Sequence, residues 1–251
     1  MKKRLTAILA VLGCCVVVNA EELVTDRPDA TESTAVVSPG SVQIESGWLY
    51  TEDDDAGVER HEGPQTLIRI GLTEVTELRL GWAGTIDEGS DGSSGVGDGE
   101  VGFKFHLHDA DGRVPETAVL VSVSIPTGDD EFTSDEVDPA VRFAFSGDVT
   151  EGVSGGVNLG VEWASDENED RDSTFIYTVA FGVGLTEGIG AYVEVFGEIG
   201  VTADGDAHSV DGGVTWLVAE NLQLDALAGV GISGDAEDWF VGAGASVRLP
   251  N

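Results

Sequence analysis

The residues best suited to hydrolytic chemistry are two histidines and two serines that lie on consecutive segments of the chain. His106 and His108 alternate along one segment, and Ser122 and Ser124 alternate along the next. If the segments paired as neighbouring strands, all four side chains would share a face, and a histidine could act as general base for a serine hydroxyl. Such polar side chains also commonly fill the interior of a barrel. No phosphate-binding glycine loop, zinc-ligand spacing or nucleophile elbow accompanies them, so we expect no enzyme.

Carboxylates are the second chemically capable group. They concentrate in stretches that look like loops, which contain Asp53, Asp54, Asp55, Asp129, Asp130, Glu131, Asp170 and Asp172. Carboxylate oxygens are preferred ligands of Ca²⁺ and Mg²⁺, so the loops could bind divalent ions and bridge to anionic lipopolysaccharide. The alternative is a solvated acidic surface. Neither reading supplies the closed ligand set of a resident metal, and we expect neither a metal site nor a cofactor.

The net charge excludes one class of partner. The chain has 251 residues with 47 acidic and 12 basic side chains, and its formal charge is -35. A phosphate backbone would be repelled, so we expect no nucleic-acid partner. Hydrophobic residues still make up 41% of the chain, which is too many for acidic disorder. The sequence therefore predicts a folded protein.

Apolar residues from Ser41 onward recur at every second position, which is the pattern of a β-strand with two different faces. One segment places Val119, Val121 and Val123 on one face, and another places Phe175 and Tyr177 there. Twelve such segments can be counted between residues 41 and 251. A further segment sets Leu78, Leu80, Trp82 and Ile86 on its apolar face, opposite Glu77, Arg79 and Thr85.

The connections between these segments alternate in length. Acidic or glycine-rich stretches, such as 52–62 and 87–98, follow the odd segments, and mostly tighter turns, such as 73–76 and 219–221, follow the even ones. Tryptophans concentrate beside the long connections, where the interface between lipid and water would lie. The pattern predicts an all-β fold, a closed up-and-down antiparallel transmembrane β-barrel of about 12 strands. A soluble β-sandwich with aromatic core edges is the alternative.

If the apolar face meets lipid, the opposite face lines a lumen. The charged residues on that face are predicted to be Arg69, Arg79, Lys104, Arg142, Glu162, Glu194, Glu198, Asp211 and Asp225. The basic residues come from the first half of the barrel and the acidic ones from the second half. One interpretation is a transverse electric field that orients dipolar solutes. The other is that these side chains pair across a narrow barrel and close it.

Residues 21–40 do not alternate and contain the most motif-like stretch of the chain. Thr-Asp-Arg-Pro-Asp-x-Thr-Glu-Ser leads through a Pro-Gly turn into Gln-x-Glu-x-Gly. This resembles the opening of the outer-membrane transporters of the MetA-pathway phenol-degradation family. The matching residues are Thr25, Asp26, Arg27, Pro28, Asp29, Thr31, Glu32, Ser33, Gly40, Gln43, Glu45 and Gly47.

The resemblance implies an outer-membrane channel for small solutes, aromatic or other hydrophobic compounds among them. The position of the arm, residues 21–40, stays open at this point. Arg27 could pair with Asp26 and Asp29 in a periplasmic turn. Alternatively, the arm could fold back into the lumen as a plug, where Arg27 would pair with an inward carboxylate such as Glu45.

The first twenty residues read as a secretory signal, because Lys2, Lys3 and Arg4 precede an apolar run that ends at Ala20. Both cysteines, Cys14 and Cys15, lie within this segment; a lipoprotein signal around Cys14 is the alternative.

These features together predict a passive channel or facilitator in the outer membrane of a Gram-negative bacterium. Its expected partners are outer-membrane lipid and lipopolysaccharide, small-molecule solutes and the outer-membrane assembly machinery. The second hypothesis is a structural or adhesive barrel with a closed lumen and acidic, ion-binding surface loops.

Overall fold

A computed structural model describes residues 23–53, 58–89, 92–165, 171–203, 205–233 and 235–249. The predicted signal segment, with both cysteines, lies outside these residues. So do the loop carboxylates Asp54, Asp55 and Asp170.

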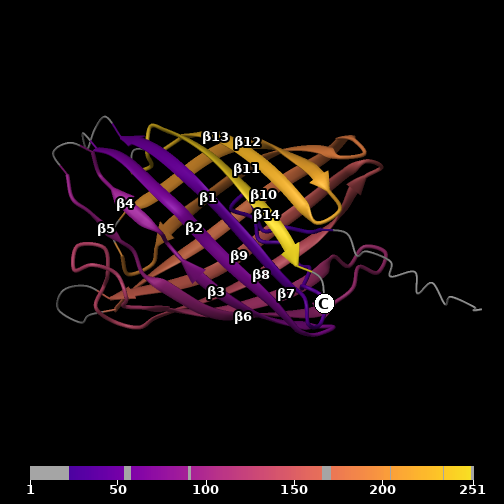
Figure 1. The fold of residues 1–251 in the computed structure, drawn as a ribbon, viewed down its shortest axis with the longest axis horizontal. Coiled ribbons are helices and arrows are strands. Elements are labelled where there is room, and N and C mark those ends of the chain that lie inside the picture. The colour runs from indigo at the N-terminus through magenta and orange to yellow at the C-terminus, as the bar shows by residue number, and fades with distance from the viewer. Residues whose placement is uncertain are drawn as a thin grey trace, which may run out of the picture.

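The described residues form fourteen strands (Figure 1). Their bounds are β1 Val42–Asp53, β2 Val58–Thr73, β3 Thr76–Trp82, β4 Thr85–Asp87, β5 Ser94–Val96, β6 Gly99–His108, β7 Glu116–Ile125, β8 Asp138–Thr150, β9 Val153–Ser165, β10 Arg171–Thr186, β11 Ile189–Gly200, β12 Asp206–Ala219, β13 Leu222–Gly231 and β14 Trp239–Leu249.

The sheet closes on itself, because β1 pairs with both β2 and β14 and each remaining barrel strand pairs antiparallel with its neighbours. Strands β3 and β4 are two parts of one barrel strand, as are β5 and β6. The ladder continues across both interruptions, where Gly97 N donates to Gly84 O at 3.0 Å and Ala83 N donates to Asp98 O at 3.1 Å. The result is a closed, twelve-stranded, up-and-down barrel, and this prediction is confirmed.

One residue of the predicted apolar face points the other way. Ile86 was expected beside Leu78, Leu80 and Trp82, but its side chain is only 5% exposed, whereas that of Trp82 is 41% exposed. The cause is the interruption between β3 and β4, where Gly84 has a φ of 87°. This backbone conformation breaks the alternation of the strand, so the residues after it change face.

The barrel is apolar outside and polar inside. Large hydrophobic side chains are exposed on most barrel strands, for example Phe103, Phe143, Val193 and Trp216. The largest fully buried side chains, in contrast, include Arg69, Lys104, Gln43, Glu45 and Glu77. This is the arrangement of a barrel whose solvent on the outside is lipid.

Among the described residues, no helix is long and apolar enough to cross a membrane.

The two rims differ as predicted, with one correction. Most turns after the even predicted segments are tight, as at 74–75, 151–152 and 187–188. The predicted loop 52–62 is instead mostly strand, since β1 runs to Asp53 and β2 begins at Val58. The pairs Thr51 with Arg60 and Glu52 with Glu59 extend the β1–β2 ladder there. The polar side chains of this stretch interrupt the apolar pattern of the sequence, which is why a loop was predicted, but the backbone pairing of β1 with β2 continues.

Candidate functional site

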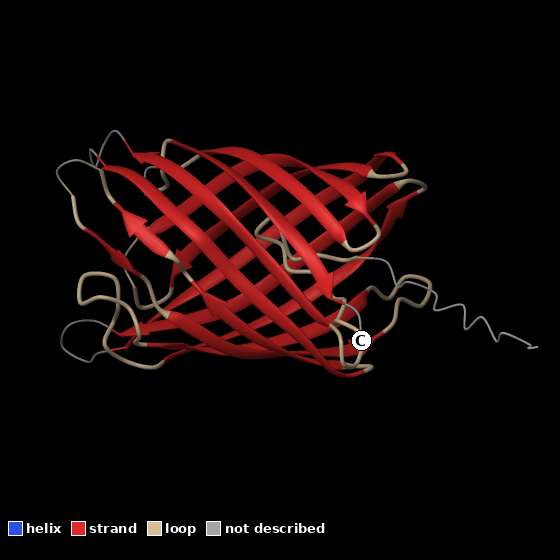
Figure 2. Cartoon of the chain, viewed as in Figure 1, coloured by secondary structure: helices blue, strands red, loops and turns tan. Residues whose placement is uncertain are grey.

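The arm lies inside the barrel. Figure 2 shows it as a loop segment enclosed by the strands. The side chains of Leu23, Asp26, Thr31, Thr34 and Val37 are buried there. Because the chain continues directly from the arm into β1, the arm enters at the rim of the short turns.

Asp26 anchors the arm to three basic side chains of the wall. Its Oδ2 lies 3.1 Å from Arg69 Nη1 on β2, 2.6 Å from Arg79 Nη1 on β3 and 2.8 Å from Lys104 Nζ on β6. Burial alone would raise the pKa of the Asp26 carboxyl. The charges of Arg69, Lys104 and Arg79 outweigh that effect and hold the pKa well below 3.8.

Three further carboxylates complete this basic cluster. Arg69 Nε lies 2.9 Å from Glu77 Oε1, and Arg69 Nη1 lies 3.0 Å from Glu45 Oε1. Arg79 Nη2 donates to both carboxylate oxygens of Glu32, at 2.8 and 2.7 Å. The cluster therefore sets four carboxylates, those of Asp26, Glu32, Glu45 and Glu77, against three cations. Removing one member of such a buried network typically costs about 3–5 kcal/mol.

The arm also contacts the opposite wall of the barrel. Ala30 N donates to Glu194 Oε2 at 2.7 Å, and the Thr31 hydroxyl donates to the same carboxylate. Glu32 N donates to Asn158 Oδ1 at 2.7 Å, and Asn158 Nδ2 donates back to Glu32 O at 3.0 Å. Reciprocal bonds of this kind satisfy an irregular backbone that would otherwise be buried without partners.

The side chain of Arg27 fits against the wall of the barrel because two glycines leave room for it. Its Nη2 lies 3.1 Å from Asp225 Oδ1. Its guanidinium lies against Gly47 and Gly244, which face each other across the β1–β14 ladder, and a Cβ at either glycine would overlap it. The inward carboxylate that Arg27 contacts is therefore Asp225 and not Glu45, which was the expected example. Glu45 instead accepts from Asp26 N at 2.9 Å, because Arg27 points to the β13–β14 side.

The predicted lumen charges divide into three sets. Arg69, Arg79 and Lys104 meet in the basic cluster. Glu194, Asp211 and Asp225 are buried on β11, β12 and β13, while Glu198 is exposed. Arg142 and Glu162 pair with each other, at 2.9 Å, on neighbouring strands.

The predicted transverse field would need an open basic wall, and Asp26, Glu32, Glu45 and Glu77 neutralise that wall. Among the described residues these charges do not pair across the barrel either, since the basic cluster pairs with carboxylates of its own wall and of the arm, and Arg142 pairs with Glu162 on the neighbouring strand.

Among the described residues, the histidine–serine dyad that the sequence made conceivable does not form. His106 pairs with Ala118 in the β6–β7 ladder, and Ser122 pairs with Gly102, four residues away. His106 Nε2 instead lies 2.8 Å from Asp109 Oδ1, and Ser122 Oγ donates to Glu100 at 3.1 Å. Among the described residues, no group of three or more His, Cys, Asp or Glu side chains is arranged to hold a metal ion.

Contributors to the docking of the arm that were missed from the sequence include Glu77, Asn158 and Gly71. Glu77 has the inward phase of its strand and was not included among the lumen residues, although it is fully buried. Asn158 lies on the inward face of β9, and only its contact with the arm distinguishes it. Gly71 passes so close to the backbone of Val37 and Ser38 that no Cβ would fit. Only Glu77 carried a sequence signal.

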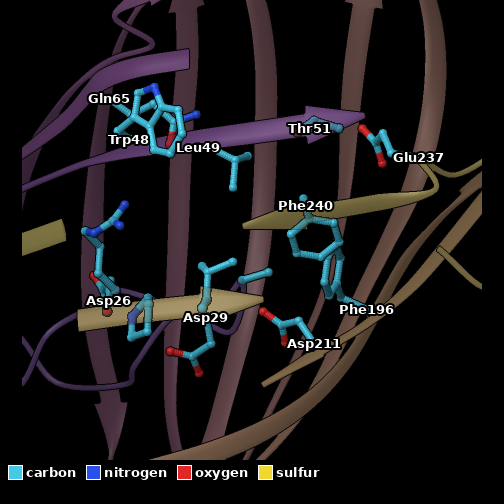
Figure 3. Close-up of a pocket in the computed structure, with 14 residues that line it drawn as sticks. Asp26, Asp29, Trp48, Leu49, Thr51, Gln65, Phe196, Asp211, Glu237 and Phe240 are labelled. Carbon is cyan, nitrogen blue, oxygen red and sulfur yellow. The ribbon is translucent and has the colours of Figure 1, made fainter. Parts of the chain in front are cut away.

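A cavity of about 350 Å³ remains between the arm and the wall of the barrel (Figure 3). Its lining combines two chemistries. Phe196, Phe240, Leu49 and Leu227 supply apolar surface, and the other lining residues are Asp26, Arg27, Pro28, Asp29, Ala30, Trp48, Thr51, Gln65, Asp211 and Glu237. The rings of Phe196 and Phe240 pack edge to face, with centroids 6.0 Å apart.

Solved structures with the same fold include an outer membrane channel and a porin. The COG4313 outer membrane channel from Pseudomonas putida F1 is 12% identical, with a TM-score of 0.67 over 86% of this chain and 98% of that chain. The KdgM porin in complex with disordered oligogalacturonate is 10% identical, with a TM-score of 0.55 over 84% and 99% of the two chains. The chain thus has the fold of bacterial outer-membrane β-barrels, and the predicted localisation agrees with it.

No curated protein matches the chain in sequence. The model of the MetA-pathway of phenol degradation family matches residues 25–249, far beyond the opening motif. That match starts within the arm, at Thr25, and extends to the last residue of β14. The chain therefore belongs to the MetA-pathway of phenol degradation family.

Proposed function

We propose that this protein is a narrow outer-membrane channel through which small solutes, aromatic and other hydrophobic compounds among them, diffuse passively. The observation that carries the proposal is a closed barrel with a polar interior in which a docked arm leaves a lined cavity. The fold, shared with a COG4313 outer membrane channel and a KdgM porin, supports it. Nothing in this role requires a cofactor.

The arm is the element that restricts passage in this proposal. Its anchors lie on opposite sides of the barrel, at the basic cluster on β2, β3 and β6 and at Glu194 on β11. A segment fixed at both sides crosses the lumen and reduces its open section. The lumen-lining charges that the arm leaves accessible to a solute are chiefly those of Arg142, Glu162 and Glu198.

Deleting residues 21–38 tests this role. The shortened protein should show a several-fold higher single-channel conductance in planar bilayers than the full barrel, because the lumen then loses its filling. Equal conductance would contradict the proposed restriction. Substitution of the exposed turn residue Asp109 by Asn serves as a control, since its side chain is almost fully exposed, and it should leave conductance unchanged.

The arm also favours the second candidate, a structural or adhesive barrel with a closed lumen. Liposome swelling distinguishes the two functions. A channel admits small neutral sugars and the liposomes swell, whereas a closed barrel leaves them unchanged. If neither the full protein nor the protein lacking residues 21–38 caused swelling, the channel proposal would fail.

A further inference from the structure

The cavity between the arm and the wall of the barrel has an excess of negative charge. Among its lining residues, Asp26 is neutralised by the basic cluster, and Arg27 is paired with Asp225. Asp29, Asp211 and Glu237 remain, and no ion pair to a basic side chain is found for any of them among the described residues. The site thus presents carboxylates without a matching cation.

Asp211 is the most informative of these groups. Its side chain is only 7% exposed, and its Oδ2 accepts a hydrogen bond from Tyr192 at 3.0 Å. Its Oδ1 is buried and has no partner among the described residues. A buried carboxylate oxygen without a donor is costly, and it marks a place where a donor belongs. Figure 3 shows the Asp211 carboxylate beneath Phe196 and Phe240, facing the side on which Asp29 lies.

The environment of Asp29 points in the same direction. Burial, together with the nearby charges of Glu194 and Asp211, raises the pKa of the Asp29 carboxyl well above 3.8. The carboxylates of Asp29, Glu194 and Asp211 therefore repel one another. A positive charge placed among them would relieve that repulsion.

The apolar half of the cavity faces these carboxylates. Phe196 and Phe240 present ring surface, and Leu49 and Leu227 extend it. Ligand cavities typically measure about 300–1,000 Å³ and combine apolar walls with a few polar groups that fix orientation. A volume of about 350 Å³ suits a small organic molecule better than a bare ion.

We propose that this cavity binds a small organic cation, in which a ring packs against Phe196 and Phe240 and an ammonium group donates to Asp211 and Asp29. The proposal rests on the proposed function, because it requires solutes to enter the lumen. The proposed site would make small organic cations the class of solute that binds most tightly inside the barrel. Arg27, which also lines the cavity, stays paired with Asp225.

The test is calorimetric binding of three probes of the same shape to the full-length, detergent-solubilised barrel. These probes are 2-phenylethylamine, which is cationic, 2-phenylethanol, which is neutral, and phenylacetate, which is anionic. The amine should bind at least about tenfold more tightly than the alcohol, as expected for a hydrogen bond to a charged group. The anion should not bind. Equal affinity for the amine and the alcohol would overturn the proposal.

Two variants locate the site. Asp211→Asn should reduce the affinity for 2-phenylethylamine about tenfold and leave the affinity for 2-phenylethanol unchanged. Glu100→Gln is the matched control, since Glu100 lies inside the barrel but outside this cavity. If Glu100→Gln weakened amine binding as much as Asp211→Asn, binding would reflect the general acidity of the lumen, and the site would be wrong.

Liposome swelling by neutral sugars, measured on the same preparations, separates this inference from the proposed function. Swelling without selective amine binding contradicts the cation site and leaves the channel intact. Selective amine binding to the full protein supports the site, and it contradicts the channel if neither the full protein nor the protein lacking residues 21–38 causes swelling. Competition of Mg²⁺ with the amine at millimolar concentration would assign the site to an inorganic ion instead.

Discussion

At the scale of single residues, the docking of Arg27 depends on two glycines. The guanidinium occupies the space that side chains at Gly47 and Gly244 would fill. We predict that Gly244→Ala displaces Arg27, weakens its contact with Asp225 and raises single-channel conductance. Gly184→Ala is the control, because a Cβ there meets no atom within 4 Å. Equal conductance of both variants and the unmodified barrel would show that this cradle does not hold the arm.

Asp29 gives a second prediction, one that depends on pH. Its pKa is raised in the folded protein by burial and by neighbouring carboxylates, so its ionised form opposes folding. The cost is absent below the ordinary value of 3.8 and grows as pH rises through the raised pKa. Asp29→Asn should therefore raise the melting temperature at pH 8 and have no effect at pH 3. A gain of the same size at both pH values would exclude this cause.

The residues of the site could be predicted only in part from the sequence. That Arg69, Arg79 and Lys104 point into the barrel follows from strand alternation, because successive side chains of a strand point to opposite faces. Their partner Asp26 comes from a segment without alternation, and no pattern indicates where such a segment docks. For the same reason the sequence suggested an inward carboxylate such as Glu45 as the partner of Arg27 and did not single out Asp225, since the choice depends on how the arm crosses the lumen.

At the scale of elements, the arm is a docked segment whose attachment to the wall of the barrel can be made covalent. Thr34 Oγ1 on the arm and Ser146 Oγ on β8 are 2.6 Å apart. Both native cysteines lie in the first twenty residues, so a pair of cysteines at 34 and 146 would have no competing thiol once that segment is removed. We predict that Thr34→Cys with Ser146→Cys forms a disulfide that lowers conductance fluctuations.

Reduction of that disulfide is the internal control. Dithiothreitol should restore the fluctuations of the unmodified barrel, and each single cysteine variant should not respond to it. If the double variant failed to crosslink under oxidising conditions, the arm would not lie beside β8. Because the crosslink is read by mass spectrometry as well as by conductance, this outcome is informative even when the channel is silent.

The strands themselves were the most predictable elements. Alternation of apolar and polar residues in each of twelve segments specifies strands with one face toward lipid. The alternating lengths of the connections specify an up-and-down order of these strands. The interruption at Ala83–Gly84 was not predictable in this way. A glycine in the left-handed region shifts the parity of the residues that follow, and hydropathy alone does not record φ.

At the scale of the whole molecule, burial is inverted relative to a water-soluble protein. Charged side chains are fully buried and large apolar side chains are exposed. In water such an exterior would be a large apolar patch, whereas in a bilayer it is a matched surface. The polar interior then needs internal partners, and the arm supplies several of them. Folding of the barrel and docking of the arm are therefore coupled through the basic cluster.

The lipid-facing surface gives the last prediction, which uses two valines of nearly equal exposure. Val193 lies within β11 and is 60% exposed, while Val201 follows the end of that strand and is 61% exposed. If exposure on β11 means contact with hydrocarbon, Val193→Arg should destabilise the barrel by about 2–4 kcal/mol and Val201→Arg by about 0–1 kcal/mol. Denaturant unfolding in lipid vesicles measures both. Equal costs for the two substitutions would mean that the belt of apolar side chains does not face the bilayer, because in water the two positions differ little.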